Sequence, residues 1–321
     1  MTAILAVLVG YRYEVGGDWG NYFQNFYDIG GLALTEVLGK SESGYNLLNW
    51  ISDRFGWGVF GVNLIGGSIF SVGLVVFCRS LPRPWLALAV AVPYMVIVVA
   101  MGYSRQGIAL GLAMLGLVAL GRRKRLWFVV WVVLGATFHM SAMLLLPIAA
   151  LAATRNRVLT FVWVGVVTLT AYLLLLDEEA VSALYVNYIE AQYASQGALV
   201  RLLMNAVPAM FQLIWWRRFE FVEAEAILWR WFAIISLTLL ALLLVSPSST
   251  AVDRVALYML PLQLVVFSHL PDAFGRRRMQ QNLMVLMVLF YYAAVQYVWL
   301  NFATHARGWI PYRFYPLEAW F

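Results

Sequence analysis

An arginine and a glutamine stand side by side at the start of a long apolar stretch, within Met101–Gly111. A charged side chain is costly inside a bilayer, so a polar pair at such a position indicates a functional site. Arg105 and Gln106 follow Tyr103 and Ser104, which add two hydroxyl groups. A helix starting here would aim its free N–H groups at the same place as the guanidinium, which can bind two phosphate oxygens at once. The pattern predicts a phosphate or pyrophosphate site; the alternative is an arginine that reaches for water at the membrane edge.

A second set of charged residues lies near the N-terminus, in Tyr11–Tyr22. Arg12, Glu14 and Asp18 alternate there with three glycines, which let the backbone turn sharply. We expect Arg12 to bind an anion, and Glu14 or Asp18 to act as a base or to bind a sugar hydroxyl. The same residue types are typical of a solvated interfacial loop, which is the alternative interpretation.

His139 lies between Thr137 and Ser141 in the middle of an otherwise apolar stretch. We expect it to position an acceptor hydroxyl or the leaving phosphate, or to move a proton; the alternative is a histidine that is hydrogen-bonded within the helix bundle. Metal binding is not predicted, because no His or Cys cluster has the spacing of metal ligands. No cofactor is expected.

Two further segments carry candidate binding residues. Asp253 and Arg254 follow a polar turn, and Tyr258 stands one helical turn later on the same face. Arg254 is a candidate second anion clamp; alternatively, it pairs only with Asp253. The C-terminal tail is rich in aromatic residues, and Tyr312 could help to cover a sugar site or could lie in an interfacial layer.

The composition indicates what must hold these residues. The 321-residue chain is 63% hydrophobic and 12% charged, with a mean hydropathy of +0.78, so it fits no soluble class. We predict one all-α polytopic integral membrane domain over residues 1–321, with about ten transmembrane or re-entrant helices. The apolar stretches, apart from a short N-terminal one, are Trp57–Phe77, Trp85–Met101, Ile108–Leu120, Leu126–Ala152, Leu159–Leu176, Leu199–Trp216, Ile227–Val245, Val255–Leu270 and Leu283–Leu300.

Lys and Arg residues predict the orientation, because basic loops stay in the cytoplasm. Two basic connections flank the stretch Leu126–Ala152, so a simple crossing would place one of them outside. A hairpin that turns at Thr137–Ser141 would keep both inside; a continuous, tilted span is the alternative. With the hairpin, residues 11–56 form an outer loop or amphipathic segment, 177–198 an outer loop and 301–321 an outer tail.

These motifs, in this order, resemble the EpsG family of Wzy-like exopolysaccharide polymerases over nearly the whole chain. The resemblance implies a GT-C-like membrane glycosyltransferase of the bacterial inner membrane whose active site faces the periplasmic side. Such an enzyme joins oligosaccharide repeat units carried on undecaprenyl pyrophosphate, by inverting transfer and without a nucleotide sugar. Its implied partners are the lipid-linked oligosaccharide, the bilayer, a chain-length regulator and export proteins, with no nucleic acid. The matching positions are Arg12, Tyr13, Val15, Gly16, Asp18, Tyr22, Ser43–Asn49, Arg105, Gln106, His139, Ser141, Arg254, Tyr258, Pro311 and Tyr312.

Two other functions are alternatives to the polymerase. A lipid-linked oligosaccharide flippase or other transporter predicts internal symmetry and polar residues at mid-membrane, whereas here the polar residues are expected at one face. A ligase or another GT-C enzyme would use the same leaving group with a different acceptor. The sequence barely separates this third function from the polymerase.

Overall fold

The computed structural model describes residues 1–151, 197–246 and 249–318, with isolated positions between 158 and 169, and the regular elements in this part of the chain are helical. The first half contains α1 (Thr2–Gly10), α2 (Trp19–Gly30), α3 (Leu34–Gly39), α4 (Ser43–Arg54), α5 (Gly58–Arg79), α6 (Pro84–Ala91), η1 (Val92–Ala100), α7 (Ser104–Gly121), α8 (Arg125–Ala136), η2 (Met140–Leu145) and α9 (Leu146–Leu151). The second half contains α12 (Ala198–Ile214), η4 (Trp216–Arg218), α13 (Glu223–Val245), α14 (Ser249–Leu257), α15 (Pro261–Phe274), α16 (Arg278–Phe302), η5 (Ala306–Gly308) and α17 (Tyr315–Glu318).

The all-helical, apolar architecture agrees with the predicted class, but the predicted number of about ten spans is not confirmed. In the described residues, four helices are long and apolar enough to cross a membrane, namely α5, α7, α13 and α16. Counting the bent pair α14 and α15 as one span gives five. Three further apolar helices, Pro84–Ala100, Arg125–Ala136 and Ala198–Ile214, are shorter. The stretch Leu159–Leu176 lies outside the continuously described residues.

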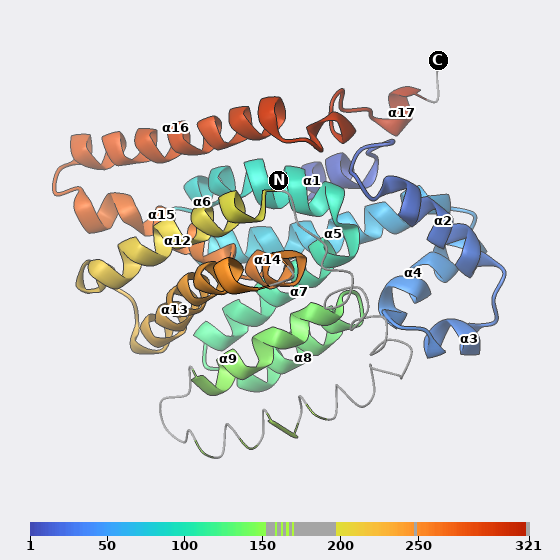
Figure 1. The fold of residues 1–321 in the computed structure, drawn as a ribbon, viewed down its shortest axis with the longest axis horizontal. Coiled ribbons are helices and arrows are strands. Elements are labelled where there is room, and N and C mark those ends of the chain that lie inside the picture. Colours follow the sequence, from blue (N-terminus) through green and yellow to red (C-terminus); the bar gives the residue numbers. More distant parts are fainter. Residues whose placement is uncertain are drawn as a thin grey trace.

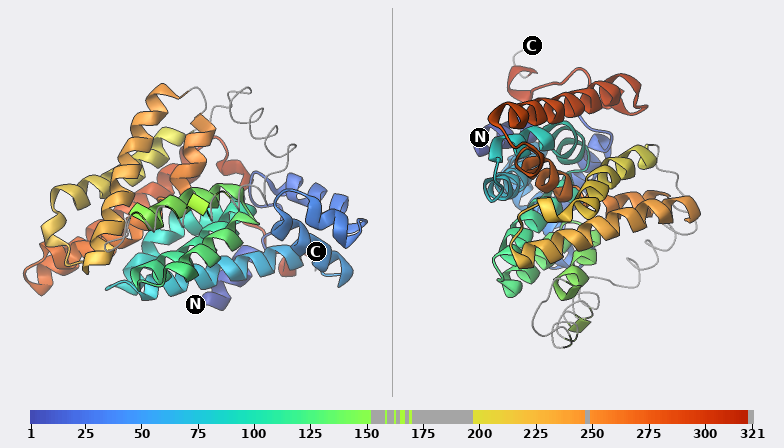
Figure 2. Two further views of the ribbon diagram at one scale, coloured as in Figure 1. Left: turned by 90° about the horizontal axis from the view of Figure 1, so that it is seen from below. Right: turned by 90° about the vertical axis from the view of Figure 1, so that its left-hand side faces the viewer.

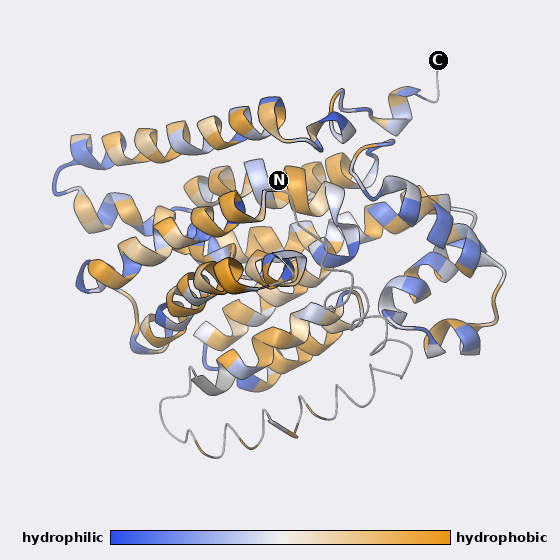
Figure 3. Ribbon diagram, viewed as in Figure 1, coloured by the Kyte–Doolittle hydropathy of each residue, from blue (hydrophilic) through white to orange (hydrophobic). Residues whose placement is uncertain are grey.

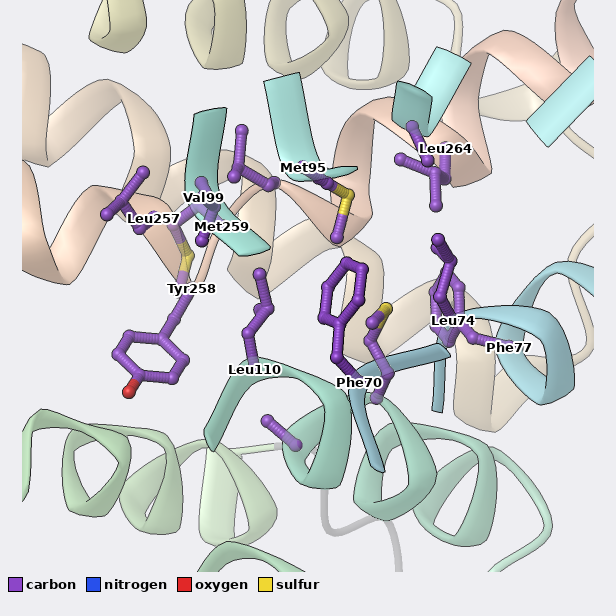
Figure 4. Packing of buried hydrophobic residues seen from close by; sticks show 14 of the residues in the cluster. Phe70, Leu74, Phe77, Met95, Val99, Leu110, Leu257, Tyr258, Met259 and Leu264 are labelled. Atoms are coloured by element: carbon purple, nitrogen blue, oxygen red, sulfur yellow. The ribbon is translucent and has the colours of Figure 1, made fainter. Parts of the chain in front are cut away.

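Helix α7 lies at the centre of the bundle and packs against α5 on one side and α8 on the other (Figure 1). Glycines allow the close approach of α5, because a Cβ atom at Gly73 would lie 2.0 Å from the carbonyl oxygen of Gly111. Small residues that bring helix backbones together are typical of membrane helix pairs. The apolar core beside α7 joins α5, η1 and the α14–α15 region, where Phe70, Met95 and Leu110 meet (Figure 4).

Two local breaks place polar residues beside this core. Pro93 lacks a backbone N–H, and the chain from Val92 to Ala100 forms a π-helix before α7 starts anew at Ser104. Pro261 starts α15, which is bent by 50° from α14. Arg105 therefore lies in the first turn of a helix, and Arg254 lies just before a bend.

The chain turns within the stretch that was predicted as a hairpin. Helix α8 ends at Ala136, and after His139 the segments η2 and α9 pack against α8 and run back along it (Figures 1 and 2). The reversal is the one expected of the hairpin rather than of a continuous span. Whether both of its ends lie in the cytoplasm stays a prediction, since Arg155 and Arg157 lie outside the described residues.

Basic helix connections gather at one end of the bundle. Arg83, before α6, forms an ion pair with Asp272 near the end of α15, at 2.6 Å, and also donates to Gln281 of α16. The Arg218 guanidinium lies 4.9 Å from the ring centre of Phe274. These contacts bring together the α5–α6, α12–α13 and α15–α16 connections, at the left of Figure 1.

The opposite end carries the polar helices α2, α3 and α4, which are mostly hydrophilic in Figure 3. Helix α2 is amphipathic and buries Tyr22, Phe26 and Ile29, whose spacing places them on one face. Residues 11–56 therefore contain the amphipathic segment that was predicted, whereas their membrane side stays a prediction. Of the predicted outer loop 177–198, only the last two residues are described, and the tail from 301 contains η5 and α17.

Candidate active site

Arg105 is held between two aromatic rings and a carboxylate. Its guanidinium carbon lies 5.6 Å from the ring centre of Tyr22 and 5.8 Å from that of Tyr45, and Nη1 donates a short hydrogen bond to Glu42 Oε2. The Arg105 side chain is nevertheless 42% exposed, against 17% for Glu42. The guanidinium is thus fixed in place and still accessible to a ligand.

Gln106 connects this group to α14. Its side chain is buried, and Nε2 donates to the backbone carbonyl of Arg254 at 2.8 Å. The two residues of the Arg-Gln pair therefore have separate roles. Arg105 lies among Tyr22, Tyr45 and Glu42, and Gln106 connects α7 to α14, the helix that carries Arg254.

Asp253 has a partner that the sequence did not indicate. Arg201 of α12 donates from Nε to Asp253 Oδ1 at 2.6 Å, and from Nη2 to Oδ2 in a short second bond. Both side chains are nearly buried, at 12% and 10% exposed. The expected alternative, in which Asp253 pairs only with Arg254, is therefore wrong, and the bidentate pair fixes α14 against α12.

The turn between α8 and η2 brings His139 to the same end. His139 Nδ1 lies 2.6 Å from Ser141 Oγ, which is also 3.5 Å from the hydroxyl of Tyr258. Figure 4 shows that the Tyr258 hydroxyl points away from the apolar cluster. Both Arg105 and Arg254 lie close enough to His139 to act on it electrostatically.

The start of α4 lies directly on this turn. The backbone N–H of Gly44 donates to the Thr137 carbonyl at 3.0 Å, and a Cβ atom at Gly44 would lie only 2.3 Å from Thr137 Oγ1. Glu42, two residues earlier, has a positive φ of 54°, a conformation that is uncommon for a residue with a side chain. The backbone bond of Gly44 therefore holds the start of α4, and with it Glu42, against the turn at Thr137.

Asp18 is the N-terminal carboxylate that joins the cluster. Burial raises the pKa of Asp18, and the nearby guanidiniums of Arg254 and Arg105 oppose that shift. Asp18 is in no ion pair with any part of the chain that the structure describes. Asp18, Glu42 and His139 thus all lie within electrostatic reach of both guanidiniums.

Arg12 lies one layer behind the cluster rather than in it. It is only 1% exposed, and it donates to the Val9 carbonyl at 2.5 Å, to Ser104 Oγ at 2.6 Å and to Asn63 Oδ1 at 3.2 Å. Burial lowers the pKa of Arg12 to about 10, so it stays protonated at neutral pH. These contacts hold α1, α5 and the start of α7 together.

Glu14 and Tyr312 contact the C-terminal tail and α1. Arg313 donates a short hydrogen bond to Glu14, whose side chain is 50% exposed, and the Tyr312 hydroxyl donates to the Leu8 carbonyl at 2.6 Å. The backbone of Arg12 pairs with that of Phe314. The structure therefore brings Asp18, Tyr103, Arg105, Gln106, His139, Arg254 and Tyr258 to one cluster and places Arg12, Glu14 and Tyr312 beside it.

Sequence reasoning missed several residues of the cluster. Glu42, Tyr45 and Arg201 were not singled out, although Tyr45 falls in Ser43–Asn49, a segment that was used only for the resemblance. The sequence could have indicated Arg201, because a charged residue near the start of an apolar stretch is expected to have a polar or charged partner. Among the described residues, no group of His, Cys, Asp and Glu could hold a metal ion.

Comparison with known proteins identifies a family. The model of the EpsG family matches residues 1–314 of the chain. No curated protein and no solved structure matches the chain significantly.

Proposed function

This chain belongs to the EpsG family, and on that premise we propose that it polymerises lipid-linked oligosaccharide repeat units in the bacterial inner membrane. The single observation that carries the proposal is that Arg105 and Arg254, on helices joined through the Gln106 side chain, both act electrostatically on Asp18, Glu42 and His139. A pyrophosphate leaving group needs cations where its charge develops, and two arginines at one accessible place meet that need.

The orientation of the protein follows from its basic connections. They gather at the end opposite the Arg105 cluster, and basic loops face the cytoplasm. In the proposed orientation the cluster faces the periplasmic side, and the family resemblance is the basis for proposing a GT-C-like enzyme. Polar residues at one end support group transfer rather than transport by alternating access, for which a site at mid-membrane is typical.

The proposed reaction is one inverting displacement. The oxygen of a sugar hydroxyl on the acceptor attacks the anomeric carbon of the donor glycan. The bond from that carbon to the pyrophosphate oxygen breaks, and the polyprenyl pyrophosphate leaves with the electron pair. Arg105 and Arg254 stabilise the leaving charge, while the proton of the attacking hydroxyl passes to a base.

Asp18 is the base that the contacts favour. It lies within electrostatic reach of both guanidiniums, whereas Glu42 already accepts a short hydrogen bond from Arg105 and Glu14 pairs with Arg313. His139 and Ser141, which are hydrogen-bonded to each other, would orient the acceptor or the leaving phosphate. Glu42 is a positioning residue for Arg105.

The test is extension of purified lipid-linked repeat unit by the purified protein. We expect a ladder of longer lipid-linked glycans with release of one polyprenyl pyrophosphate per added unit, and inverted configuration at the new linkage. A parallel reaction with a non-repeat acceptor distinguishes a ligase. Movement of the intact substrate across a vesicle membrane without extension would contradict the proposal.

A further inference from the structure

A cavity of about 550 Å³ lies beside the cluster, between η1, α12 and α16. Most of its lining is apolar, including Val98, Val200, Met204, Ala294 and Val298. The lining residues of α16 extend from Tyr291 to Phe302, which corresponds to a helix rise of about 17 Å. The volume falls within the range of about 300–1,000 Å³ that is typical of small-molecule sites.

Two residues of the cavity lining are neighbours of the candidate active site. Tyr103, which lines it, caps the N-terminus of α7 two residues before Arg105. Arg201 also lines it and holds Asp253, the neighbour of Arg254. The cavity lining is thus mostly apolar, and its one arginine, Arg201, is paired with the carboxylate next to Arg254 in the chain.

The cavity walls are held in place by a buried chain of hydrogen bonds. The Tyr292 hydroxyl of α16 donates to Gln263 Oε1 at 2.6 Å, and Gln263 Nε2 donates to Asn205 Oδ1 at 2.7 Å. Asn205 Nδ2 in turn donates to the Ala256 carbonyl at 2.8 Å. These bonds tie α16 to α15, α12 and α14, so hydrogen bonds within the protein fix the helices that carry the cavity walls.

Helix α16 lies along one edge of the bundle, and most of its side chains are exposed (Figures 1 and 2). A long apolar chain could therefore enter the cavity from the surrounding bilayer. Its anionic end would then lie where Arg105 and Arg254 meet.

We propose that this cavity binds the part of a polyprenyl chain that adjoins the phosphate of the lipid carrier. The inference rests on the proposed function and names the cavity that holds the lipid part of the same substrate. A polyprenyl phosphate fits better than a phospholipid, because its chain is attached directly to the phosphate. Its anion and chain are then contiguous, and Tyr103 and Arg201 likewise connect the cavity lining to the residues around Arg105 and Arg254.

Two neighbouring alanines of α16 provide a matched pair for the test. Both are exposed, but Ala294 belongs to the cavity lining and Ala293 does not. Adjacent residues point about 100° apart on a helix of 3.6 residues per turn. Ala294→Trp should therefore fill the cavity, while Ala293→Trp adds the same bulk in a direction outside the lining.

The probe is undecaprenyl monophosphate, added to the detergent-purified full chain, with the shift in thermal unfolding midpoint as the readout. We expect the wild type and Ala293→Trp to be stabilised alike, and Ala294→Trp to bind at least tenfold more weakly. Farnesyl monophosphate, with its short chain, and phosphatidylglycerol should give much smaller shifts. Ala294→Leu replaces the tryptophan variant if the latter does not fold.

Equal binding by the two alanine variants, or an equal shift with phosphatidylglycerol, would overturn the cavity assignment. The assay contains no sugar and requires no turnover, so its outcome is separate from that of the extension reaction. A wild type that binds the probe but extends no glycan would contradict the proposed reaction alone. Normal extension by Ala294→Trp with an unchanged KM for the long-chain donor would contradict the cavity alone.

Discussion

Replacement of Arg105 by alanine should abolish most transfer activity while the protein still folds. The variant removes the guanidinium that lies between Tyr22 and Tyr45 and that donates to Glu42. In the proposed reaction this guanidinium stabilises charge that appears only as the pyrophosphate leaves. Its loss should therefore lower kcat rather than only raise KM.

The two effects differ in size. Loss of one donor that stabilises developing charge costs about 10²–10³ in kcat, or roughly 2.7–4 kcal/mol. The stability effect is smaller, because the Arg105 side chain is 42% exposed and solvent screens its pair with Glu42. About 1 kcal/mol for that pair and about 0.5–1 kcal/mol for each ring contact give a loss of about 2–3 kcal/mol. A folded protein of ordinary stability, about 5–15 kcal/mol, tolerates that loss.

Steady-state extension of the lipid-linked repeat unit, at saturating donor, measures the effect on kcat. Arg83→Ala is the matched control, because it removes an arginine that also pairs with a carboxylate, Asp272, but at the other end of the bundle. We expect the control to keep a kcat close to that of the wild type. An Arg105→Ala protein that is folded and keeps more than a third of wild-type kcat would refute the reasoning.

Three further predictions concern the surrounding residues. Because burial raises the pKa of Asp18 above the ordinary 3.8, transfer should be lost as the pH falls through that raised value. Asp18→Asn should remove this acidic limb and most of the activity. The variant should nevertheless unfold at an equal or higher temperature at pH 7, because ionising Asp18 in the folded protein costs stability at a pH above its raised pKa. Glu14→Gln is the control and should leave the pH–rate profile unchanged. Arg12→Ala should lower stability by on the order of 3 kcal/mol, because it leaves buried hydrogen-bond partners unsatisfied, and a normal unfolding temperature would show that its contacts matter little. Gly73→Ala should reduce the yield of folded protein, since its Cβ would lie 2.0 Å from a carbonyl oxygen of α7, whereas Gly39→Ala, which meets nothing within 4 Å, should not.

The sequence predicted most of the cluster because buried or half-buried charges are conspicuous in an apolar chain. Arg105, Gln106, His139 and Arg254 stand out for that reason, and they do lie together. The hairpin turn was predicted from charge alone, since basic residues on both sides of one apolar stretch conflict with a single crossing.

Other features depend on contacts between residues far apart in the chain. Glu42 reaches Arg105 because Gly44 allows α4 to start directly on the turn at Thr137. Arg12 is as polar as Arg105 in the sequence, and only packing shows that Ser104 and Asn63 enclose it. The count of about ten spans is not confirmed, because in the described residues only four helices, or five with the bent pair at Pro261, are long and apolar enough to cross a membrane.

The central claim is that Arg105 and Arg254 act on the same leaving pyrophosphate. Its most direct test is kcat for the wild type, Arg105→Ala, Arg254→Ala and the double variant, each confirmed to be folded. Groups that act as a unit are strongly non-additive. We predict that the double variant loses at least tenfold less activity than the product of the two single losses. Single losses that multiply within twofold would show that the two arginines act independently, and would contradict the claim.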